Sequence, residues 1–232
     1  MSCQVIGLNG LIGAAALISC VVISPAAAQK TGTRLDQNRG AVGSISKLDK
    51  KSAIRATHAF GQCIAYRETK KAQRSLELPF ASAEQLKVLN EATNSFDACL
   101  GTSPEFDLLS FPPVLFAGSA AEYFVRLKYA KSDLGGLAGI TDEALDKTEF
   151  RPRNALEDLG MCVVRRNPGN ARALVLTRPT ETEEAEALKI LLPDIGPCVF
   201  EGQQVSLNTP NLRAIIAYAL YRAASKLGAA GA

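Results

Sequence analysis

The sequence predicts an all-α protein, built as a tandem duplication of a three-helix unit that is closed by a disulfide in each copy. Two observations carry this prediction: a composition poor in aromatic residues and an internal repeat that includes four Cys. Phe, Tyr and Trp make up only 6% of the 232 residues and Trp is absent, while Ala and Leu supply much of the apolar content. Such a composition favours helices over β-sheets, which are rich in aromatic and β-branched residues.

The repeat becomes visible when the second half of the chain is compared with the first at an offset of 99 residues. Cys63 and Cys99 are separated by 36 residues, and so are Cys162 and Cys198. The same offset superimposes other residues of like character, namely Phe60 on Leu159, Gly61 on Gly160, Ile64 on Val163 and Arg67 on Arg166. We therefore expect two helical repeats and a linker between them, at residues 47–131, 153–232 and 132–152 respectively.

Each repeat is expected to contain three helices, because apolar residues recur at helical spacing and start signals precede them. The second helix begins at a capping box, at Ser82 or Thr180, in which a hydroxyl and a later side chain satisfy exposed amides. Glu122 and Arg213 in the third helices argue against membrane spans there. The expected first helices are residues 47–69 and 153–166, and the expected third helices are residues 113–131 and 210–227.

Residues 1–28 have the features of a secretory signal peptide. They contain no Asp, Glu, Lys or Arg, and an apolar run leads to small residues that predict cleavage after Ala28. Two alternatives stay open: lipidation at Cys20, because the residues before it loosely resemble a bacterial lipobox, and retention of the run as a membrane anchor. Each alternative places the rest of the chain outside the cytoplasm. Residues 29–46 are expected to form a flexible lead-in.

Four Cys follow the expected signal peptide, and an even number in an exported chain indicates a disulfide framework. Four Cys allow three pairings. The repeat favours Cys63 with Cys99 and Cys162 with Cys198, each closing a loop worth about 3–4 kcal/mol of stability. Export and disulfides together predict a periplasmic protein.

The net charge of +3 is too small to indicate nucleic-acid binding, but its distribution is uneven. Residues 30–75 hold 11 Lys and Arg against 3 Asp and Glu, whereas residues 76–232 hold 15 against 20. Clustered Lys and Arg each contribute about 1 kcal/mol near an anionic membrane. The hypothesis is therefore membrane contact through the basic N-terminal segment or through a lipidated Cys20. The alternative is a solvated tail followed by a solvated helix face.

Motifs typical of catalysis or of cofactor binding are weak or absent in the sequence. His58 is the only His, which excludes a multi-His metal site, and nearby Cys63 is expected to be in a disulfide. Residues 44–47 fit the S-x-x-K nucleophile motif, but the companion K-T-G is missing downstream, so we interpret them as helix-cap residues. The acids of residues 181–186 fit the first turn of a helix. No catalytic residue, metal ligand or cofactor is predicted.

Aromatic residues of the third helices form the candidate binding surface. Tyr123 in the first copy and Tyr218 and Tyr221 in the second would line a cleft between the copies, with Arg67 and Arg166 beside it. Aromatic anchors dominate sites for peptides, glycans and lipid tails. Core packing of the same aromatic residues is the default interpretation, and the cleft is the alternative. Acids of shifted pKa next to both Arg would favour an enzyme, and their absence would favour binding alone.

The segment Gly160–Arg166, together with Cys198 and the segments Leu212–Ala214 and Ala217–Arg222, resembles uncharacterised exported proteins of sphingomonad-type bacteria. The resemblance covers most of the chain that follows the expected signal peptide. It brings no assigned activity with it, so no site residue is carried over. The first copy departs from this pattern at Tyr66, which stands where the first residue of the Arg pair would be.

The expected function is non-enzymatic: a periplasmic protein that binds or scaffolds an envelope protein, a glycan or a lipid. A duplicated scaffold without a convergent polar site, and the uneven charge, are the observations behind it. The competing class is an envelope hydrolase whose site is assembled by the fold. A third class is an inhibitor of a secreted enzyme, which would present a rigid, exposed loop near Cys99 or Cys198.

Overall fold

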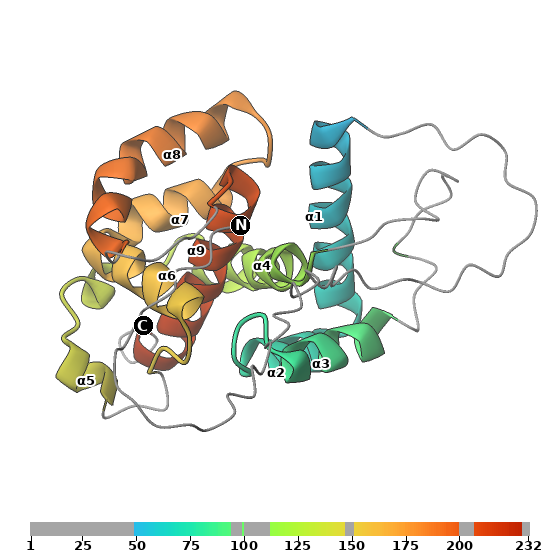
Figure 1. Ribbon diagram of the computed structural model, residues 1–232, viewed down its shortest axis with the longest axis horizontal. Coiled ribbons are helices and arrows are strands. Elements are labelled where there is room, and N and C mark those ends of the chain that lie inside the picture. Colours follow the sequence, from blue (N-terminus) through green and yellow to red (C-terminus); the bar gives the residue numbers. More distant parts are fainter. Residues whose placement is uncertain (1–48, 94–98, 100–111, 147–150, 200–206, 229–232) are drawn as a thin grey trace, which may run out of the picture. The chain divides into compact units, whose positions relative to one another are not determined.

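The computed structural model describes residues 49–93, 99, 112–146, 151–199 and 207–228, which all belong to one unit, Gly32–Ala232. The expected signal peptide, the lead-in, Cys20 and the S-x-x-K motif lie outside the described residues. In the described part every regular element is a helix and no strand occurs, which confirms the all-α prediction (Figure 1). The α-helices are α1 (Lys50–Arg67), α2 (Thr69–Leu76), α3 (Ala83–Thr93), α4 (Pro113–Phe124), α5 (Asp142–Asp146), α6 (Ala155–Arg166), α7 (Pro168–Leu176), α8 (Thr182–Ile195) and α9 (Thr209–Ala223).

Four shorter elements complete the described part. Each of the two long apolar helices, α4 and α9, continues into a π-helix, and two 3₁₀ turns follow elsewhere in the chain. These elements are the π-helices η3 (Val125–Tyr129) and η6 (Ala224–Gly228) and the 3₁₀ turns η4 (Gly135–Leu137) and η5 (Gly196–Cys198). The expected third helices therefore exist over nearly their whole expected length.

Helices α4 and α9 form the centre of the core. They pack against each other, α1 packs on α4, and α6 packs on α9 (Figure 1). Every residue of α9 from Leu212 to Ala223 is buried, because this helix is covered on several sides. No described helix is long and apolar enough to cross a membrane.

Glycines allow these helices to approach closely. A Cβ atom placed on Gly118 of α4 would lie 2.4 Å from the Cα of Ala214 in α9. On Gly61 of α1 it would lie 1.8 Å from the Oγ of Ser119, and on Gly160 of α6 it would lie 2.9 Å from a backbone oxygen of α9. Because real Cβ contacts are longer than this, these three positions exclude any larger residue without movement of the helices.

The chain breaks after α1 and after α6, and each break starts an additional helix that the sequence analysis did not anticipate. Glu68 (φ −110°, ψ 46°) separates α1 from α2, and Asn167 (φ −151°, ψ 78°) separates α6 from α7. Pro168 disfavours a helical conformation at the residue before it and suits the first position of a new helix. The Asn167 side chain accepts a hydrogen bond from the Asn170 amide, 3.0 Å away, and so caps α7.

The capping box is confirmed in part at Ser82, where the Gln85 side chain accepts from the Ala81 amide at 2.7 Å and not from the Ser82 amide, and it is wrong at Thr180. The Ser82 hydroxyl oxygen accepts a hydrogen bond from the Gln85 amide at 3.1 Å, ahead of α3. Helix α8 instead begins at Thr182, and its preceding residue makes no side-chain cap bond. Thr180 has a left-handed backbone (φ 69°), and its amide donates to Glu184 Oε2 at 2.7 Å.

The two halves of the described chain follow the same order of elements. In each, a long helix is followed by a short helix, a third helix, an apolar helix and a π-helix. Ala81 (φ 59°) and Thr180 are the two described non-glycine residues with positive φ, and they stand at the same 99-residue offset as the Cys. Descent of the halves from one duplicated unit stays a prediction. The expected linker contains η4 and the short helix α5.

Both predicted disulfides are present. Cys63 is bonded to Cys99 and Cys162 to Cys198, each with a Cα–Cα distance of 5.7 Å and a sequence separation of 36 residues. Each bond joins the middle of the first helix of its half to a segment that follows the third helix. Disulfides persist in oxidising compartments, so they indicate an exported environment.

Candidate functional site

The residues of the predicted ligand cleft lie in different surroundings. Tyr218 and Tyr221 are buried in the core, where Tyr221 packs against the Phe124 ring. Tyr123 is half-buried, and Arg67 is exposed. Arg166 is exposed and lies 3.7 Å from Asp194, with which it forms an ion pair. No hydrogen bond or ion pair between described residues joins Arg67 or Arg166 to the three Tyr.

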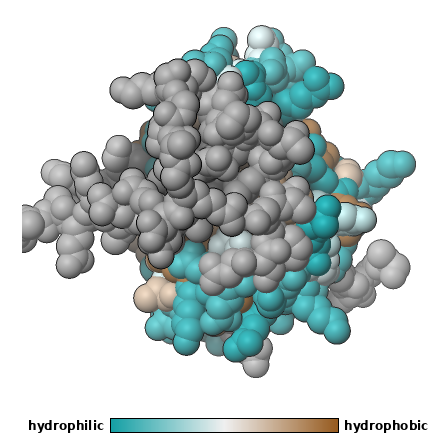
Figure 2. Space-filling view, turned by 90° about the vertical axis from the view of Figure 1, so that its right-hand side faces the viewer, coloured by the Kyte–Doolittle hydropathy of each residue, from teal (hydrophilic) through white to brown (hydrophobic). Residues whose placement is uncertain are grey.

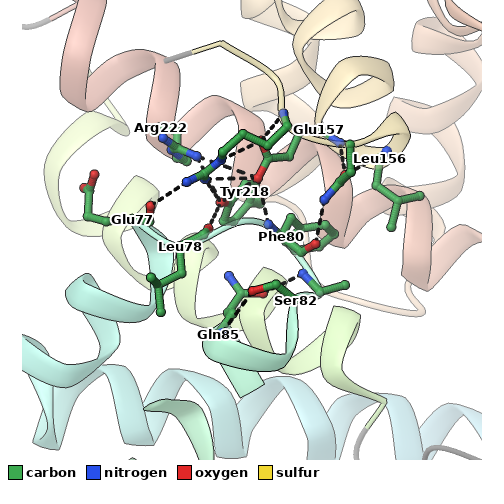
Figure 3. Close-up of polar contacts among 12 residues, drawn as sticks. Glu77, Leu78, Phe80, Ser82, Gln85, Leu156, Glu157, Tyr218 and Arg222 are labelled. Carbon is green, nitrogen blue, oxygen red and sulfur yellow. Dashed lines mark hydrogen bonds and ion pairs between the residues drawn. The ribbon is translucent and has the colours of Figure 1, made fainter. Parts of the chain in front are cut away.

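Tyr218 belongs to a buried polar cluster around Glu157, which we call the Glu157 cluster. Figure 3 shows Glu157 from α6, Tyr218 and Arg222 from α9 and the Phe80 amide converging on one place. Glu157 Oε1 accepts hydrogen bonds from the Phe80 amide at 2.7 Å and from Arg153 Nη2 at 3.1 Å. Its Oε2 accepts from the Arg153 amide at 2.9 Å. The carboxylate therefore ties α6 to the turn that precedes α3.

The Tyr218 hydroxyl completes the Glu157 cluster. It lies 2.5 Å from the Leu78 carbonyl oxygen and 3.2 Å from Glu157 Oε1, and one hydroxyl proton can serve only one of them. The shorter contact assigns the proton to Leu78. Arg153 and Arg222 each donate a hydrogen bond to the hydroxyl oxygen at 3.2 Å. The hydroxyl therefore donates one hydrogen bond and accepts two, and it joins α9 to the turn after α2.

The Glu157 cluster holds one carboxylate and two guanidinium groups, and the pKa values of Glu157 and Tyr218 are shifted in opposite directions. Burial by itself raises the pKa of Glu157, but hydrogen bonds from Arg153 and from the Phe80 amide lower it, and the net direction is downward. Burial raises the pKa of Tyr218 well above its ordinary value. The group at neutral pH is therefore an ionised carboxylate and a protonated phenol. Neither is poised to exchange a proton near pH 7.

A second buried cluster, the Arg213 cluster, lies between α4, α9 and the ends of α7 and α8. Arg213 is completely buried and grips Glu122 through two bonds, from Nε to Oε1 at 2.7 Å and from Nη2 to Oε2 at 3.0 Å. Its Nη1 donates to Glu184 Oε1 at 3.2 Å. Burial by itself raises the pKa of Glu122, but Arg213 and His58 lower it below its usual value. A buried charge is tolerated here because two carboxylates and several carbonyls surround it.

Arginines also donate hydrogen bonds to the carbonyl oxygens at the end of α7, which lack partners within the helix. Arg213 donates to the carbonyl oxygens of Leu174, Val175 and Thr177 at 2.9–3.0 Å. Arg126 from η3 donates to the Leu176 oxygen at 2.9 Å. These contacts give both guanidinium groups a structural role in fixing the α7–α8 turn.

His58 faces the Arg213 cluster from α1. It is 2% exposed, and its Nδ1 lies 3.5 Å from Glu122 Oε1, at the outer limit of a hydrogen bond. Neither ring nitrogen has a hydrogen bond of good geometry with a described residue. The described residues hold no group of three or more His, Cys, Asp or Glu placed to bind a metal ion.

The cavity beside the Glu157 cluster is small. Pro152, Met161 and Ala219 line it together with Glu157, Tyr218 and Arg222, and its volume is about 10 Å³. This is about the space of one water molecule. A substrate therefore has no room beside the buried carboxylate.

A much larger opening lies where α5 faces α6, and we call it the α5–α6 groove. Its volume is about 640 Å³, within the range of about 300–1,000 Å³ that small-ligand sites occupy. The described residues that line it are Asp142, Leu145, Asp146, Arg151, Pro152, Arg153, Asn154, Asp158, Cys162, Arg165 and Pro197. Three Asp and three Arg therefore line the same groove.

Most of the groove's charges are paired. Arg165 Nη1 contacts Asp142 Oδ1 at 2.6 Å, and Arg151 Nε contacts Asp146 Oδ1 at 3.2 Å. Asp158 is different: in the described part of the chain its carboxylate has no hydrogen bond or ion pair, although the residue is half-buried. Among the described acids of the groove, Asp158 is therefore the one whose carboxylate could receive a ligand.

The sequence analysis missed the α5–α6 groove because its residues were divided between the expected linker and the expected first helix of the second repeat. The available signal was the mixture of Asp and Arg between residues 142 and 165. Only the packing of α5 beside α6 brings these charges together.

Comparisons with protein-family models, with curated proteins and with solved structures found no match for this chain.

Proposed function

We propose that this chain is an exported, non-enzymatic binding or scaffolding protein of the periplasm, and that the α5–α6 groove holds its ligand. The observation that carries the proposal is the free carboxylate of Asp158 in a groove of about 640 Å³. A half-buried, unpaired acid costs solvation free energy, and a cationic ligand group would recover it. The two disulfides support an oxidising compartment, and the expected signal peptide supports export.

The wall that carries Asp158 is rigid, which suits a binding site. Asp158 and Cys162 stand one turn apart on α6, and Cys162 is bonded to Cys198. The Asn154 side chain caps the same helix by accepting hydrogen bonds from the Leu156 and Glu157 amides at 3.1 and 3.0 Å. A ligand would therefore meet a fixed carboxylate rather than one that must first be ordered.

The mixed charges of the groove indicate the kind of ligand. An amine or guanidinium group would pair with Asp158, and an acidic group would compete with Asp146 for the exposed Arg151. A peptide segment that carries one charge of each sign has both features. A peptide of this kind is the ligand class we propose.

The observations give less support to the two competing classes. A hydrolase that uses a carboxyl group as its general acid needs a pKa near the working pH, whereas the pKa values of the buried Glu122 and Glu157 are lowered. An inhibitor would present a rigid loop near Cys99 or Cys198. The residues next to these positions, 94–98, 100–111 and 200–206, lie outside the described part of the chain.

A peptide library tests the proposal. The immobilised protein is incubated with random pentapeptides that contain one Lys and one Glu, and mass spectrometry identifies the peptides that are retained. We expect retention by the wild type, and about tenfold weaker retention by Asp158→Asn, because one charge-assisted contact is lost. Glu186→Gln, which removes an exposed acid of α8 instead, should bind like the wild type.

Three other outcomes would count against the proposal. Equal retention by the wild type and Asp158→Asn would exclude the groove as the site. Retention of nothing by the wild type would exclude charged peptides as the ligand class. Recovery of cleaved peptides would favour the hydrolase.

A further inference from the structure

A second surface, at the ends of α1 and α4, combines exposed apolar side chains with unpaired cations. Tyr66, near the end of α1, is 67% exposed, and Leu127, in η3, is 62% exposed. The Tyr66 ring meets the half-buried Tyr123 ring edge-on, with centroids 6.3 Å apart, and this contact joins α1 to α4. We call Tyr66, Tyr123 and Leu127 the Tyr–Leu patch. On the face shown in Figure 2, the described surface is mostly hydrophilic, with only small apolar areas.

The π-helix explains why Leu127 is exposed. Ala120, Ala121, Phe124 and Val125 form the buried stripe of α4, and a regular helix would carry that stripe on to residues 127 and 128. The wider turn of η3 instead brings Tyr129 against the core, five residues after Phe124. Leu127 and Lys128 are thereby turned toward solvent.

Cations flank the Tyr–Leu patch along the chain. Arg67 and Lys70 follow Tyr66, and Lys128 and Lys131 follow Leu127; all four are exposed. None of the four forms an ion pair with a described acid, and the Lys128 ammonium lies 5.6 Å from the centre of the Phe124 ring. The one acid in these two segments, Glu68, is held by Lys71 at 3.1 Å. The positive charge around the patch is therefore not neutralised by the described residues.

We infer that the Tyr–Leu patch docks on the surface of a membrane that contains anionic lipid. Tyr prefers the membrane interface because its ring is apolar and its hydroxyl is polar. Each nearby Lys or Arg is attracted by the negative charge of an anionic leaflet. Leu127 would enter the boundary between head groups and acyl chains, where its exposed side chain leaves water.

The apolar members distinguish a membrane from a soluble polyanion. A dissolved acidic polymer would pair with Arg67, Lys70, Lys128 and Lys131 but would gain nothing from an exposed Leu. This inference is independent of the α5–α6 groove, because none of the groove's lining residues belongs to the patch.

Vesicle binding tests the inference. The full chain is sedimented with vesicles of phosphatidylcholine alone or with about one third phosphatidylglycerol, the anionic lipid whose surface attracts Lys and Arg. We expect binding to the anionic vesicles only. Leu127→Ser should weaken this binding about tenfold, because the contact with the acyl region is lost. Leu192→Ser is the matched control, since Leu192 is a similarly exposed Leu (53%) on α8.

The alternatives give different results. If Lys128→Glu abolishes binding but Leu127→Ser does not change it, the patch is a polyanion site and the membrane inference is wrong. If neither change matters, the basic segment before the described residues, shared by all variants, is responsible for any binding, and the inference is also wrong. Far-UV circular dichroism of each variant checks that the helices are intact.

Discussion

The two halves of the described chain contain the same succession of helices but place opposite chemistry at one equivalent position. Position 58 in α1 carries His, and position 157 in α6 carries Glu. Glu157 accepts hydrogen bonds from the Phe80 amide and from Arg153, and the Arg222 guanidinium lies 3.7 Å from its Oε1. His58 meets a carboxylate that Arg213 already holds.

This difference teaches that each half is completed by the other. The Glu157 cluster joins α6 and α9 to the turn before α3, and the Arg213 cluster joins α9 to Glu122 of α4. The polar groups of the opposite half therefore determine which side chain fits at position 58 or 157. The helix that carries the position does not. Variants in both halves test this difference between the Glu157 cluster and the Arg213 cluster.

The largest effect is expected at Arg213. Arg213→Met should lower the free energy of unfolding by about 3–5 kcal/mol, because it leaves Glu122 as an uncompensated buried charge. Arg153→Met in the other cluster should cost only about 1–2 kcal/mol, because the Arg153 side chain is 31% exposed and Glu157 keeps the Phe80 amide. Urea denaturation followed by circular dichroism measures both. Arg178→Met, at an exposed position, is the control, and a loss there equal to that at Arg213 would contradict the argument.

The two disulfides allow the stability of the two halves to be compared, because they close loops of equal length. Replacing either pair by Ala should cost about 3–4 kcal/mol, since both loops span 36 residues. Cys198 is completely buried whereas Cys99 is half-buried, so the second pair should cost about 1 kcal/mol more through the cavity it leaves. Unfolding of the two double variants gives the difference. Equal losses would show that loop closure alone sets the effect.

The loss of stability on replacing a glycine by Ala should depend on the atoms that the added methyl group contacts. Gly118→Ala drives a methyl group against the backbone of Ala214 and should cost about 1–3 kcal/mol. Gly61→Ala meets mainly the Ser119 side chain, so adding Ser119→Ala should restore about 1 kcal/mol. Gly136→Ala has open space around it and serves as the control. Absence of coupling between positions 61 and 119 would contradict the close α1–α4 contact.

A smaller effect is expected from pH. The pKa values of Glu122 and Glu157 are lowered in the folded protein, so the unfolded chain binds more protons in the acid range. The stability they contribute is complete above the ordinary pKa of 4.5 and declines as the pH falls below it. Burial also raises the pKa of Tyr221 to about 12, so stability should decline as the pH rises from 10.0 toward 12.

Unfolding curves recorded from pH 3 to pH 11 would follow both pH effects, about 1.4 kcal/mol accompanying each pKa unit of difference between the states. Tyr221→Phe should flatten part of the alkaline decline, the rest of which comes from the raised pKa of Tyr218, and leave the acid decline unchanged. Glu157→Gln should flatten part of the acid decline. An acid limb that is identical in Glu157→Gln and the wild type would contradict the assignment.

The smallest effects are expected at the two left-handed residues. Ala81→Gly and Thr180→Gly should each raise stability by about 0.5–1 kcal/mol, because Gly adopts positive φ without a steric cost. The gain should be larger at Thr180, whose side chain is β-branched. Ala138→Gly, at an ordinary φ of −70°, should lower stability instead. Differential scanning calorimetry resolves changes of this size.

Local patterns in the sequence were sufficient for the helices and the disulfides. Apolar spacing predicted the helices, Ser82 was identified as a cap, and the equal separations of the Cys selected one pairing of three. These features depend on residues close together in the chain or on a simple offset. The breaks at Glu68 and Asn167 were missed, although Pro168 is a local signal for the second of them.

The polar clusters and the groove were decided by the tertiary structure. The apolar context of Arg213 differs from that of the exposed Arg178, but no local pattern identifies Glu122, 91 residues away, as its buried partner. Core packing was the default interpretation of Tyr218 and Tyr221 and is confirmed, but only the packing of α9 among its neighbours excludes them from a ligand cleft. Asp158 became a candidate site only in the folded structure, where it lines the α5–α6 groove and its carboxylate has no hydrogen bond or ion pair with a described residue. Burial and pairing depend on segments far apart in the chain, so only the folded arrangement assigns them.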